Sequence, residues 1–310
     1  RMLTETSKLK ILVVGAGIGG LSLAAILERA ETPNAIFEKA SILKPLRSAM
    51  TFGPGVRCQC LPQLGIIDRI VTKGKVTKVG FISNEKTELL TSFDYNTGMV
   101  EWFRWPTYTI VRQALHSTLL DLISKEKIRL GQRVLSRIET VGDITIKTSD
   151  NSTHQGYILI GADEAYSSVR HALYEQLMKK NELPGTDKAP LSYSTICLVG
   201  QTRPLNDSTF AYIAGEECRI EYVLGDTKPY FCVMFTMAEK IVCWMVFEML
   251  DRSYYKDQED YQASNWGPEA ALAIGQSAMF DAVVSANYLN ILESNKVKDI
   301  KQVLQAYRDE

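Results

Sequence analysis

Residues 10–20 read KILVVGAGIGG, and this stretch decides the fold. The short apolar run Lys10 to Val14 ends at a glycine, which is typical of a buried parallel strand. The small and apolar residues Gly19 to Ala30 predict a helix, and Ala35 to Glu38 predict a second strand. Together these residues predict a β-α-β unit.

The glycines of this stretch predict a turn that binds a dinucleotide. Gly15 permits the tight turn after the strand, Gly17 lets a pyrophosphate approach the backbone, and Gly20 lets the helix pack closely on the sheet. The N–H groups at the start of the helix then face the phosphates. Glu38 ends the next strand, 18 residues after Gly20, where a carboxylate accepts hydrogen bonds from the ribose hydroxyls. The motif alone does not separate FAD from NAD.

Hydrophobic periodicity predicts further elements along the chain. Helices are expected over Pro54 to Val71, Arg112 to Lys125, Ser167 to Lys180 with Ser167 as N-cap, Ser277 to Leu292, and Val297 to Tyr307. Strands are expected over Val76 to Phe93, Ile128 to Ile146, and Tyr157 to Ile160. From Ser192 to Phe247 the aromatic and β-branched residues predict a long antiparallel sheet, which suits a substrate domain.

Composition excludes several classes of function. The chain has 310 residues, is 45% apolar and carries a net charge of −1, so no basic field attracts nucleic acid. No apolar run approaches the roughly 20 residues that span a bilayer, and we expect a cytoplasmic protein, with a membrane anchor outside these residues left open. The six cysteines lack zinc spacing and are expected to be reduced and mostly buried, and no metal site is predicted.

Two later segments add a resemblance to a family. Residues 109–115 read TIVRQAL, and residues 161–170 read GADEAYSSVR. With residues 10–40, they resemble the cofactor segments of FAD-dependent monooxygenases of the aromatic-hydroxylase-like family, the group A flavoprotein monooxygenases, and the fungal members in particular. The resemblance extends from about Lys10 to Ala271. It implies an α/β fold in which a Rossmann-like FAD-binding domain (1–75, 103–185 and 266–310) is interleaved with an antiparallel β-sheet substrate domain (76–102 and 186–265).

The resemblance assigns cofactor contacts to residues outside the glycine turn. Asp163 follows a predicted strand and is assigned to the ribityl hydroxyls, although it also suits a helix cap. Arg112 is assigned to the polar middle of the cofactor, and its alternative is a surface arginine at a helix start. Arg47 lies where some relatives carry an arginine near the pyrophosphate. Lys39 shares the turn of Glu38, and Gly275 is assigned to a helix start facing the flavin or is a plain helix-start glycine.

The sequence departs from the family at two places. Glu164 stands where the family usually has glycine, and it adds bulk and charge beside the cofactor. A third fingerprint, Gly-Asp with a following His and Pro, is missing, and the chain around Ala271 to Ile274 resembles a join across a deletion. Both departures bear on whether FAD is bound.

The resemblance implies an activity. NADPH or NADH reduces FAD, the reduced flavin reacts with O2 to form a C4a-hydroperoxide, and one oxygen atom passes to an aromatic, prenylated or terpenoid-like small molecule. The catalytic chemistry then lies in the flavin, with no catalytic side chain assigned. The alternatives are another FAD oxidoreductase, such as a reductase or an oxidase, and a catalytically impaired relative that only binds a ligand. A plain NAD-dependent dehydrogenase leaves Arg112 and Asp163 unexplained.

Overall fold

The computed structural model describes residues 10–44, 47–53, 60–96, 99–140, 142–188, 192–206, 208, 211–225 and 230–255. These residues form two compact units, which share no sheet. The first unit contains the described residues of 10–44 and 119–188, and the second contains those of 45–118 and 189–255. The assignment of an FAD-binding domain and a substrate domain to these parts of the chain stays a prediction.

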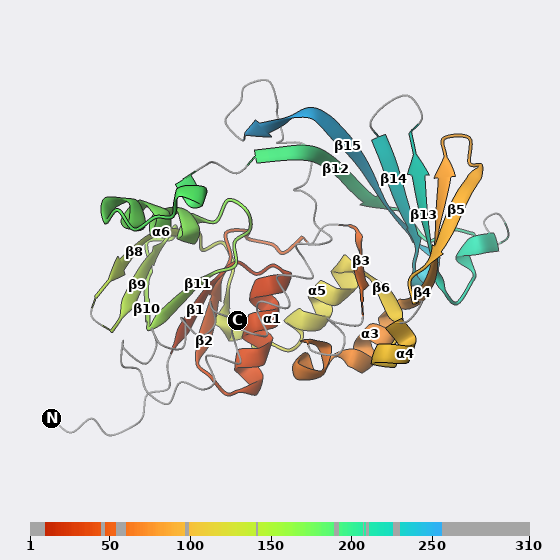
Figure 1. Ribbon diagram of the computed structural model, residues 1–310. Helices are drawn as coiled ribbons and strands as arrows, with labels where there is room; N and C mark the ends of the chain where they lie inside the picture. Colours follow the sequence, from red (N-terminus) through yellow and green to blue (C-terminus); the bar gives the residue numbers. More distant parts are fainter. Residues whose placement is uncertain are drawn as a thin grey trace. The chain divides into compact units, whose positions relative to one another are not determined.

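The first unit is built on a four-stranded parallel sheet (Figure 1). Its strands, in spatial order, are β11 (Ile158–Gly161), β1 (Ile11–Val14), β2 (Asn34–Phe37) and β7 (Ile128–Arg129). Ile11 pairs with Ile158 on one side and with Asn34 on the other. Every residue of β1 and β2 is buried, which explains why these strands are almost wholly apolar.

Further elements cover this sheet. Helix α1 (Ile18–Arg29) lies against β1 and β2, and α6 (Ser168–Lys179) lies against β11 (Figure 1). An antiparallel sheet of β8 (Val134–Glu139), β9 (Ile144–Thr148) and β10 (Thr153–Gly156) also packs on the parallel sheet. The core between the two sheets is made by Leu12, Ala35, Phe37, Ile144 and Ile146. Alternate residues of β1 and β2 therefore face opposite layers.

The second unit is built on an eight-stranded, mainly antiparallel sheet (Figure 1). Its path runs through β12 (Ser192–Gln201), β15 (Val242–Tyr255), β14 (Tyr230–Thr236), β13 (Cys218–Leu224), β4 (Lys75–Asn84), β6 (Thr107–Val111) and β3 (Ala49–Phe52), and β5 (Leu89–Asp94) pairs with β4. The pair β13–β4 is parallel, and the other pairs are antiparallel. The predicted α/β fold, with a parallel sheet and a separate antiparallel sheet, is confirmed.

Short helices complete the described elements. They are α3 (Ile67–Lys73), α4 (Met99–Phe103), α5 (Arg112–Leu120) and the 3₁₀ helices η1 (Lys125–Lys127), η2 (Gly185–Lys188), η3 (Ala211–Ile213) and η4 (Ala238–Lys240). Among the described residues, none of the helices has the length and apolar character needed to cross a membrane.

Two helix predictions were wrong in extent. The helix expected over Pro54 to Val71 is interrupted, because Gly65 adopts a φ of 68° between a helical segment at 60–64 and α3. The helix expected from Arg112 to Lys125 ends at Leu120, after which the backbone turns and buries Ile123. The helices expected over 277–292 and 297–307 lie outside the described residues.

Helix α6 follows its prediction closely. Its N-cap is Ser167, whose hydroxyl oxygen accepts a hydrogen bond from the backbone N–H of Arg170 at 3.0 Å. This bond satisfies one of the free donors at the helix start.

The described cysteines are free thiols. Cys60, Cys197, Cys218 and Cys243 are buried and Cys232 is half-buried, whereas Cys58 lies outside the described residues. Burial raises the pKa of the Cys197 thiol to about 11 and that of the Cys243 thiol to about 12. These thiols are therefore protonated at neutral pH and contribute to the core as small apolar groups.

Candidate functional site: a pocket at the carboxyl edge of the parallel sheet

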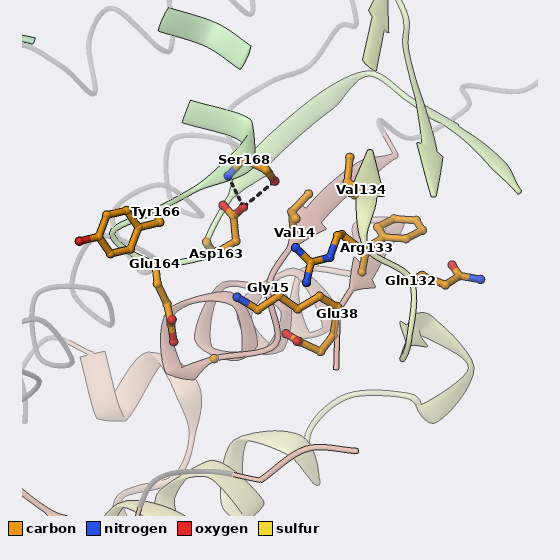
Figure 2. A pocket seen from close by; sticks show the side chains of 14 residues that line it. Val14, Gly15, Glu38, Gln132, Arg133, Val134, Asp163, Glu164, Tyr166 and Ser168 are labelled. Atoms are coloured by element: carbon orange, nitrogen blue, oxygen red, sulfur yellow. Dashed lines mark hydrogen bonds between the residues drawn. The ribbon is translucent and has the colours of Figure 1, made fainter. Parts of the chain in front are cut away.

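The first unit has a pocket where its four parallel strands end (Figure 2). In α/β folds, ligands bind at this carboxyl edge. The residues that line the pocket are Val14, Gly15 and Gly17 at the end of β1, Phe37, Glu38 and Lys39 at the end of β2, Gln132, Arg133 and Val134 between β7 and the start of β8, and Ala162, Asp163, Glu164, Tyr166 and Ser168 after β11. Within the described residues its cavity volume is about 140 Å³, below the roughly 300–1,000 Å³ of typical ligand pockets. The pocket therefore suits one part of a dinucleotide.

Two glycines of the turn are required by close backbone contacts. Gly15 has a φ of 108°, and a Cβ at this position would lie 2.3 Å from the carbonyl oxygen of Ala162. A Cβ on Gly20 would lie 2.0 Å from the carbonyl oxygen of Gly15. Any side chain at either position would force the strand, the turn and the helix apart. The predicted structural roles of these glycines thus have a geometric basis.

Gly17 differs from these two glycines because it faces open space. It is the N-cap of α1, it makes no side-chain cap, and a Cβ placed on it would have no atom within 4 Å among the described residues. The first N–H groups of α1 lack intrahelical acceptors, and the helix dipole is positive at this end. The turn therefore has the geometry and the electrostatics to bind an anionic group next to Gly17.

Glu38 ties the glycine turn to the end of β2. One carboxylate oxygen accepts a hydrogen bond from the backbone N–H of Ala16 at 2.9 Å, and the other accepts one from the backbone N–H of Ala40 at 2.8 Å. Each carboxylate oxygen has a second lone pair available for another donor. Glu38 can therefore hold the turn and accept hydroxyl groups of a ligand at the same time.

Asp163 combines a capping role with an unused acceptor. Its Oδ2 accepts hydrogen bonds from the backbone N–H of Ser168 at 2.7 Å and from the Ser168 hydroxyl at 2.8 Å (Figure 2). Its Oδ1 is buried and has no hydrogen-bond partner within the described part of the chain. A buried carboxylate oxygen without a hydrogen bond lowers the stability of the fold, so we expect this atom to accept a hydrogen bond from a ligand.

Glu164 has the backbone conformation of a glycine. Its φ is 73°, which non-glycine residues rarely adopt. The turn after β11 therefore keeps the left-handed backbone geometry that glycine favours, although the residue is a glutamate. The Glu164 side chain is exposed and lines the same pocket as Asp163 (Figure 2).

The arginines and the last glycine predicted for the cofactor lie elsewhere in the chain. Arg47 is exposed and precedes β3 in the second unit, and Arg112 begins α5. The two segments meet within that unit, because the backbone N–H of Arg112 donates a hydrogen bond to the carbonyl oxygen of Ser48 at 2.8 Å. Gly275 lies outside the described residues. The cofactor roles of these three residues stay predictions.

Sequence reasoning missed part of the pocket, namely Gln132, Arg133 and Tyr166. The first two follow β7, a strand of two residues that pairs in parallel with β2. Had Ile128 and Arg129 been recognised as a strand of the parallel sheet, the carboxyl-edge rule would have pointed to the residues after them. Within the described residues, no group of three or more His, Cys, Asp or Glu side chains is placed to hold a metal ion.

Comparison with protein families gives this pocket a context. A family described as FAD binding domain matches residues 8–199, which is more than half of the chain and contains all the pocket residues. The chain belongs to the FAD binding domain family. The resemblance seen in the three cofactor segments is thereby confirmed, and FAD is the cofactor for which the family is named.

Relatives of this FAD binding domain include named fungal enzymes. The chain is 29% identical over 185 residues to the FAD-dependent monooxygenase pynG of Aspergillus niger, covering 58% of this chain and 41% of that protein. It is 26% identical over 271 residues to the FAD-dependent monooxygenase ptmM of Penicillium ochrochloron, covering 85% of this chain and 61% of that protein. The chain spans about half the length of the curated relatives that it matches.

The fold of this FAD binding domain protein also matches solved structures. Klebsiella pneumoniae HpxO in complex with FAD and uric acid superposes with a TM-score of 0.73 at 18% sequence identity, over 99% of this chain and 85% of that chain. At this level of identity the match shows a shared fold.

The residues of the pocket fit FAD. Space is open at Gly17, where the pyrophosphate of a dinucleotide would approach the start of α1. Glu38 retains acceptor capacity for ribose hydroxyls, and the buried Oδ1 of Asp163 lacks the donor that a ribityl hydroxyl would supply. The Glu164 side chain, which brings a carboxylate into the pocket on a glycine-like backbone, is the feature of this FAD binding domain that fits least well.

Proposed function

We propose that the full-length protein is an FAD-dependent monooxygenase that uses NADPH or NADH and O2 to insert one oxygen atom into a small organic molecule. The supporting observation is the pocket in which the glycine turn, Glu38 and the unpaired Oδ1 of Asp163 meet. Bound FAD supplies the redox chemistry, which amino-acid side chains do not provide. The names of the curated relatives support a monooxygenase rather than another FAD enzyme.

The protein's own residues would bind and orient the cofactor. We propose that Gly17 lies beside the pyrophosphate, that Glu38 and Lys39 bind the adenosine ribose, and that Asp163 accepts a hydrogen bond from a ribityl hydroxyl. Gly15 and Gly20 shape the turn without contacting the ligand through a side chain. Arg47 and Arg112 are proposed as cations for the middle of the cofactor, and the role of Gly275 rests on the family resemblance.

The second unit offers a surface for an aromatic or prenylated substrate. Phe93 lies 5.0 Å from Tyr95 and 5.9 Å from Tyr222 between ring centroids, and the hydroxyls of the two tyrosines are 2.7 Å apart. Phe231 and Phe247 stack with centroids 4.4 Å apart. Tyr95, Tyr222 and both stacked rings are only partly buried against the core of the sheet. Half-buried aromatic rings suit contact with a planar, apolar ligand.

A second candidate function is ligand binding without catalysis. The observation that favours it is Glu164, which places a carboxylate and a strained backbone in the pocket where glycine is expected. A negative charge at this position opposes the anionic cofactor.

The visible absorption spectrum of the purified full-length protein tests both proposals. With the monooxygenase, the oxidised-flavin bands of bound FAD bleach on addition of NADPH and return in air, and a substrate increases the consumption of NADPH and O2 together. Bleaching and return without any substrate-dependent O2 uptake, across phenols, indoles and prenylated aromatics, would indicate a reductase or an oxidase. Failure to bind FAD at any concentration would favour the second candidate function, ligand binding without catalysis.

A further inference from the structure

The loop after β7 is fixed to the turn that carries Glu38. The backbone N–H of Gln132 donates a hydrogen bond to the carbonyl oxygen of Glu38 at 2.9 Å, and the N–H of Gly131 donates one to the carbonyl oxygen of Ala40 at 2.9 Å. Arg133 follows directly. The loop and the Glu38 turn therefore form one rim of the pocket, although they are about 90 residues apart in the sequence.

The backbone of Arg133 is held from the other side as well. Its N–H donates a hydrogen bond to the Ser149 hydroxyl at 3.1 Å, and its carbonyl oxygen accepts one from the Ser149 N–H at 2.8 Å. The same hydroxyl donates to the carbonyl oxygen of Gly131 at 3.0 Å. Because the backbone is held on both sides, the Arg133 side chain leaves the chain at a fixed point beside the pocket that it lines (Figure 2).

More negative than positive side chains line the pocket, so the positive charge of Arg133 matters for binding an anion. Three carboxylates line the pocket, those of Glu38, Asp163 and Glu164, against two cations, those of Lys39 and Arg133. A pyrophosphate adds further negative charge, so its binding here depends on the two cations. Arg133 makes no ion pair with the described part of the chain, and a guanidinium binds phosphate oxygens through two parallel hydrogen bonds.

We propose that Arg133 is the cation of the first unit that selects the diphosphate bound at this pocket, and that it acts on free ADP as well as on FAD. The inference rests on the proposed function, because it assigns one half of FAD to this pocket. The glycine turn offers its N–H groups to the phosphates from one side, and Arg133 offers its guanidinium from the loop across the pocket. The small cavity suits the diphosphate and the sugar hydroxyls on either side of it rather than the whole cofactor.

Calorimetric titration of the flavin-free full-length protein with ADP, FAD and FMN tests the proposal. Wild-type protein is expected to bind ADP and FAD, with ADP binding weakening as salt is raised. Arg133→Ala should weaken the binding of both by about tenfold or more and leave the binding of FMN, which lacks the adenosine, unchanged. Arg133→Lys should recover part of the affinity, because it keeps the charge without the planar fork.

Arg29→Ala is the matched control. Arg29 is an exposed arginine of the same unit at the last residue of α1, the end of the helix opposite Gly17. This variant should bind ADP, FAD and FMN as the wild type does. Circular dichroism of each variant checks the fold, which we expect to persist because the Arg133 side chain is exposed and its backbone hydrogen bonds do not involve the guanidinium.

The outcomes separate this inference from the proposed function. FAD binding by the wild type with ADP affinity unchanged in Arg133→Ala would overturn the inference and leave the proposed function standing. An equal loss of FMN affinity would also overturn it, since Arg133 would then act on the flavin half. If the wild type binds neither ADP nor FAD, both proposals fail. ADP that still binds FAD-saturated protein through Arg133 would assign the pocket to the ADP moiety of NAD(P)H instead of FAD.

Discussion

The Glu38 carboxylate accepts a hydrogen bond from the backbone N–H of Ala16, 22 residues earlier in the chain, at 2.9 Å. Its second oxygen accepts one from the N–H of Ala40 at 2.8 Å. One side chain therefore sets the spacing between the glycine turn and the end of β2. Glu38, which is proposed to bind the ribose, therefore also holds the glycine turn beside the end of β2.

Replacement of Glu38 should lower both stability and FAD affinity. In Glu38→Ala both N–H groups lose a charged acceptor, and we expect the free energy of unfolding to fall by roughly 1.5–3 kcal/mol. The free energy of unfolding of Glu38→Gln should lie between those of wild type and Glu38→Ala. The amide oxygen still accepts one of the two hydrogen bonds, whereas the amide NH2 faces the other N–H and cannot accept from it. Urea unfolding and FAD titration measure the two effects. Glu182→Ala, at an exposed glutamate, is the control, and unchanged stability in Glu38→Ala would contradict the structural role.

Gly17→Ala should separate folding from cofactor binding. A Cβ at Gly17 meets no described atom within 4 Å, so the variant should unfold at the same urea concentration as the wild type. The same methyl group would occupy the space in which we expect the pyrophosphate, so FAD affinity should fall by about tenfold or more, as expected for about 1.4 kcal/mol.

Gly185→Ala is the control for Gly17→Ala. Gly185 also has open space around its Cβ position, but it lies in η2 and does not line the pocket. It should retain both stability and FAD affinity. Equal FAD affinity in Gly17→Ala and wild type would place the pyrophosphate away from this turn.

Glu164→Gly should stabilise the protein and strengthen FAD binding. The left-handed conformation at φ 73° costs a non-glycine residue about 1 kcal/mol, part of which glycine recovers. The substitution also removes a carboxylate from the pocket. We expect a rise of up to about 1 kcal/mol in the free energy of unfolding, together with a lower Kd for FAD in fluorescence titration.

Glu239→Gly provides the comparison for Glu164→Gly. Glu239 is an exposed glutamate of η4 with a φ of 60°, so its replacement should give a similar gain in stability. It lies in the second unit and does not line the pocket, so FAD affinity should stay at the wild-type value. A gain in FAD affinity in both variants would show that general stabilisation, not the pocket, is responsible.

The Tyr95–Tyr222 pair should make stability depend on alkaline pH. Burial, followed by the hydrogen bond with Tyr222, raises the pKa of Tyr95 above its usual value near 10. The contribution of the neutral hydroxyl is thus fully present below pH 10 and is lost as the pH rises above it. Tyr95→Phe should be less stable than wild type at pH 8 by about 1 kcal/mol, and the difference should shrink above pH 10.

Denaturant unfolding between pH 8 and pH 11 measures this effect. Tyr174→Phe serves as the control, because the Tyr174 hydroxyl makes no hydrogen bond with the described part of the chain. It should follow the wild-type curve over the whole range. A constant gap between Tyr95→Phe and wild type would show that Tyr95 ionises equally in the folded and unfolded states.

The parts of the site that sequence predicts are those encoded locally. A strand, a glycine turn and a helix follow one another within residues 10–30, so the placement of Gly15, Gly17 and Gly20 needs no distant contact. Glu38 and Asp163 each follow a recognisable apolar strand, which is enough to place them at the carboxyl edge.

Arg133 could not be predicted in the same way. It follows a strand of two residues, and the pairing of that strand with β2 depends on tertiary packing. The interruption at Gly65 has a similar origin, because the helical period of the flanking residues continues across it. The positive φ of Glu164 could be suspected only because the family usually has glycine there.

The parallel pairing of β1 with β11 has a consequence for how the protein is made. Ile11 pairs with Asn34 on one side and with Ile158 on the other, so the strand that carries the glycine turn gains its second neighbour only after almost 150 further residues have been synthesised. Such non-local pairing slows folding, because a long loop must close before the contact forms. During translation, the cofactor pocket therefore stays open on one side until Asp163 has left the ribosome. Uptake of FAD would then report that this stage of folding is complete.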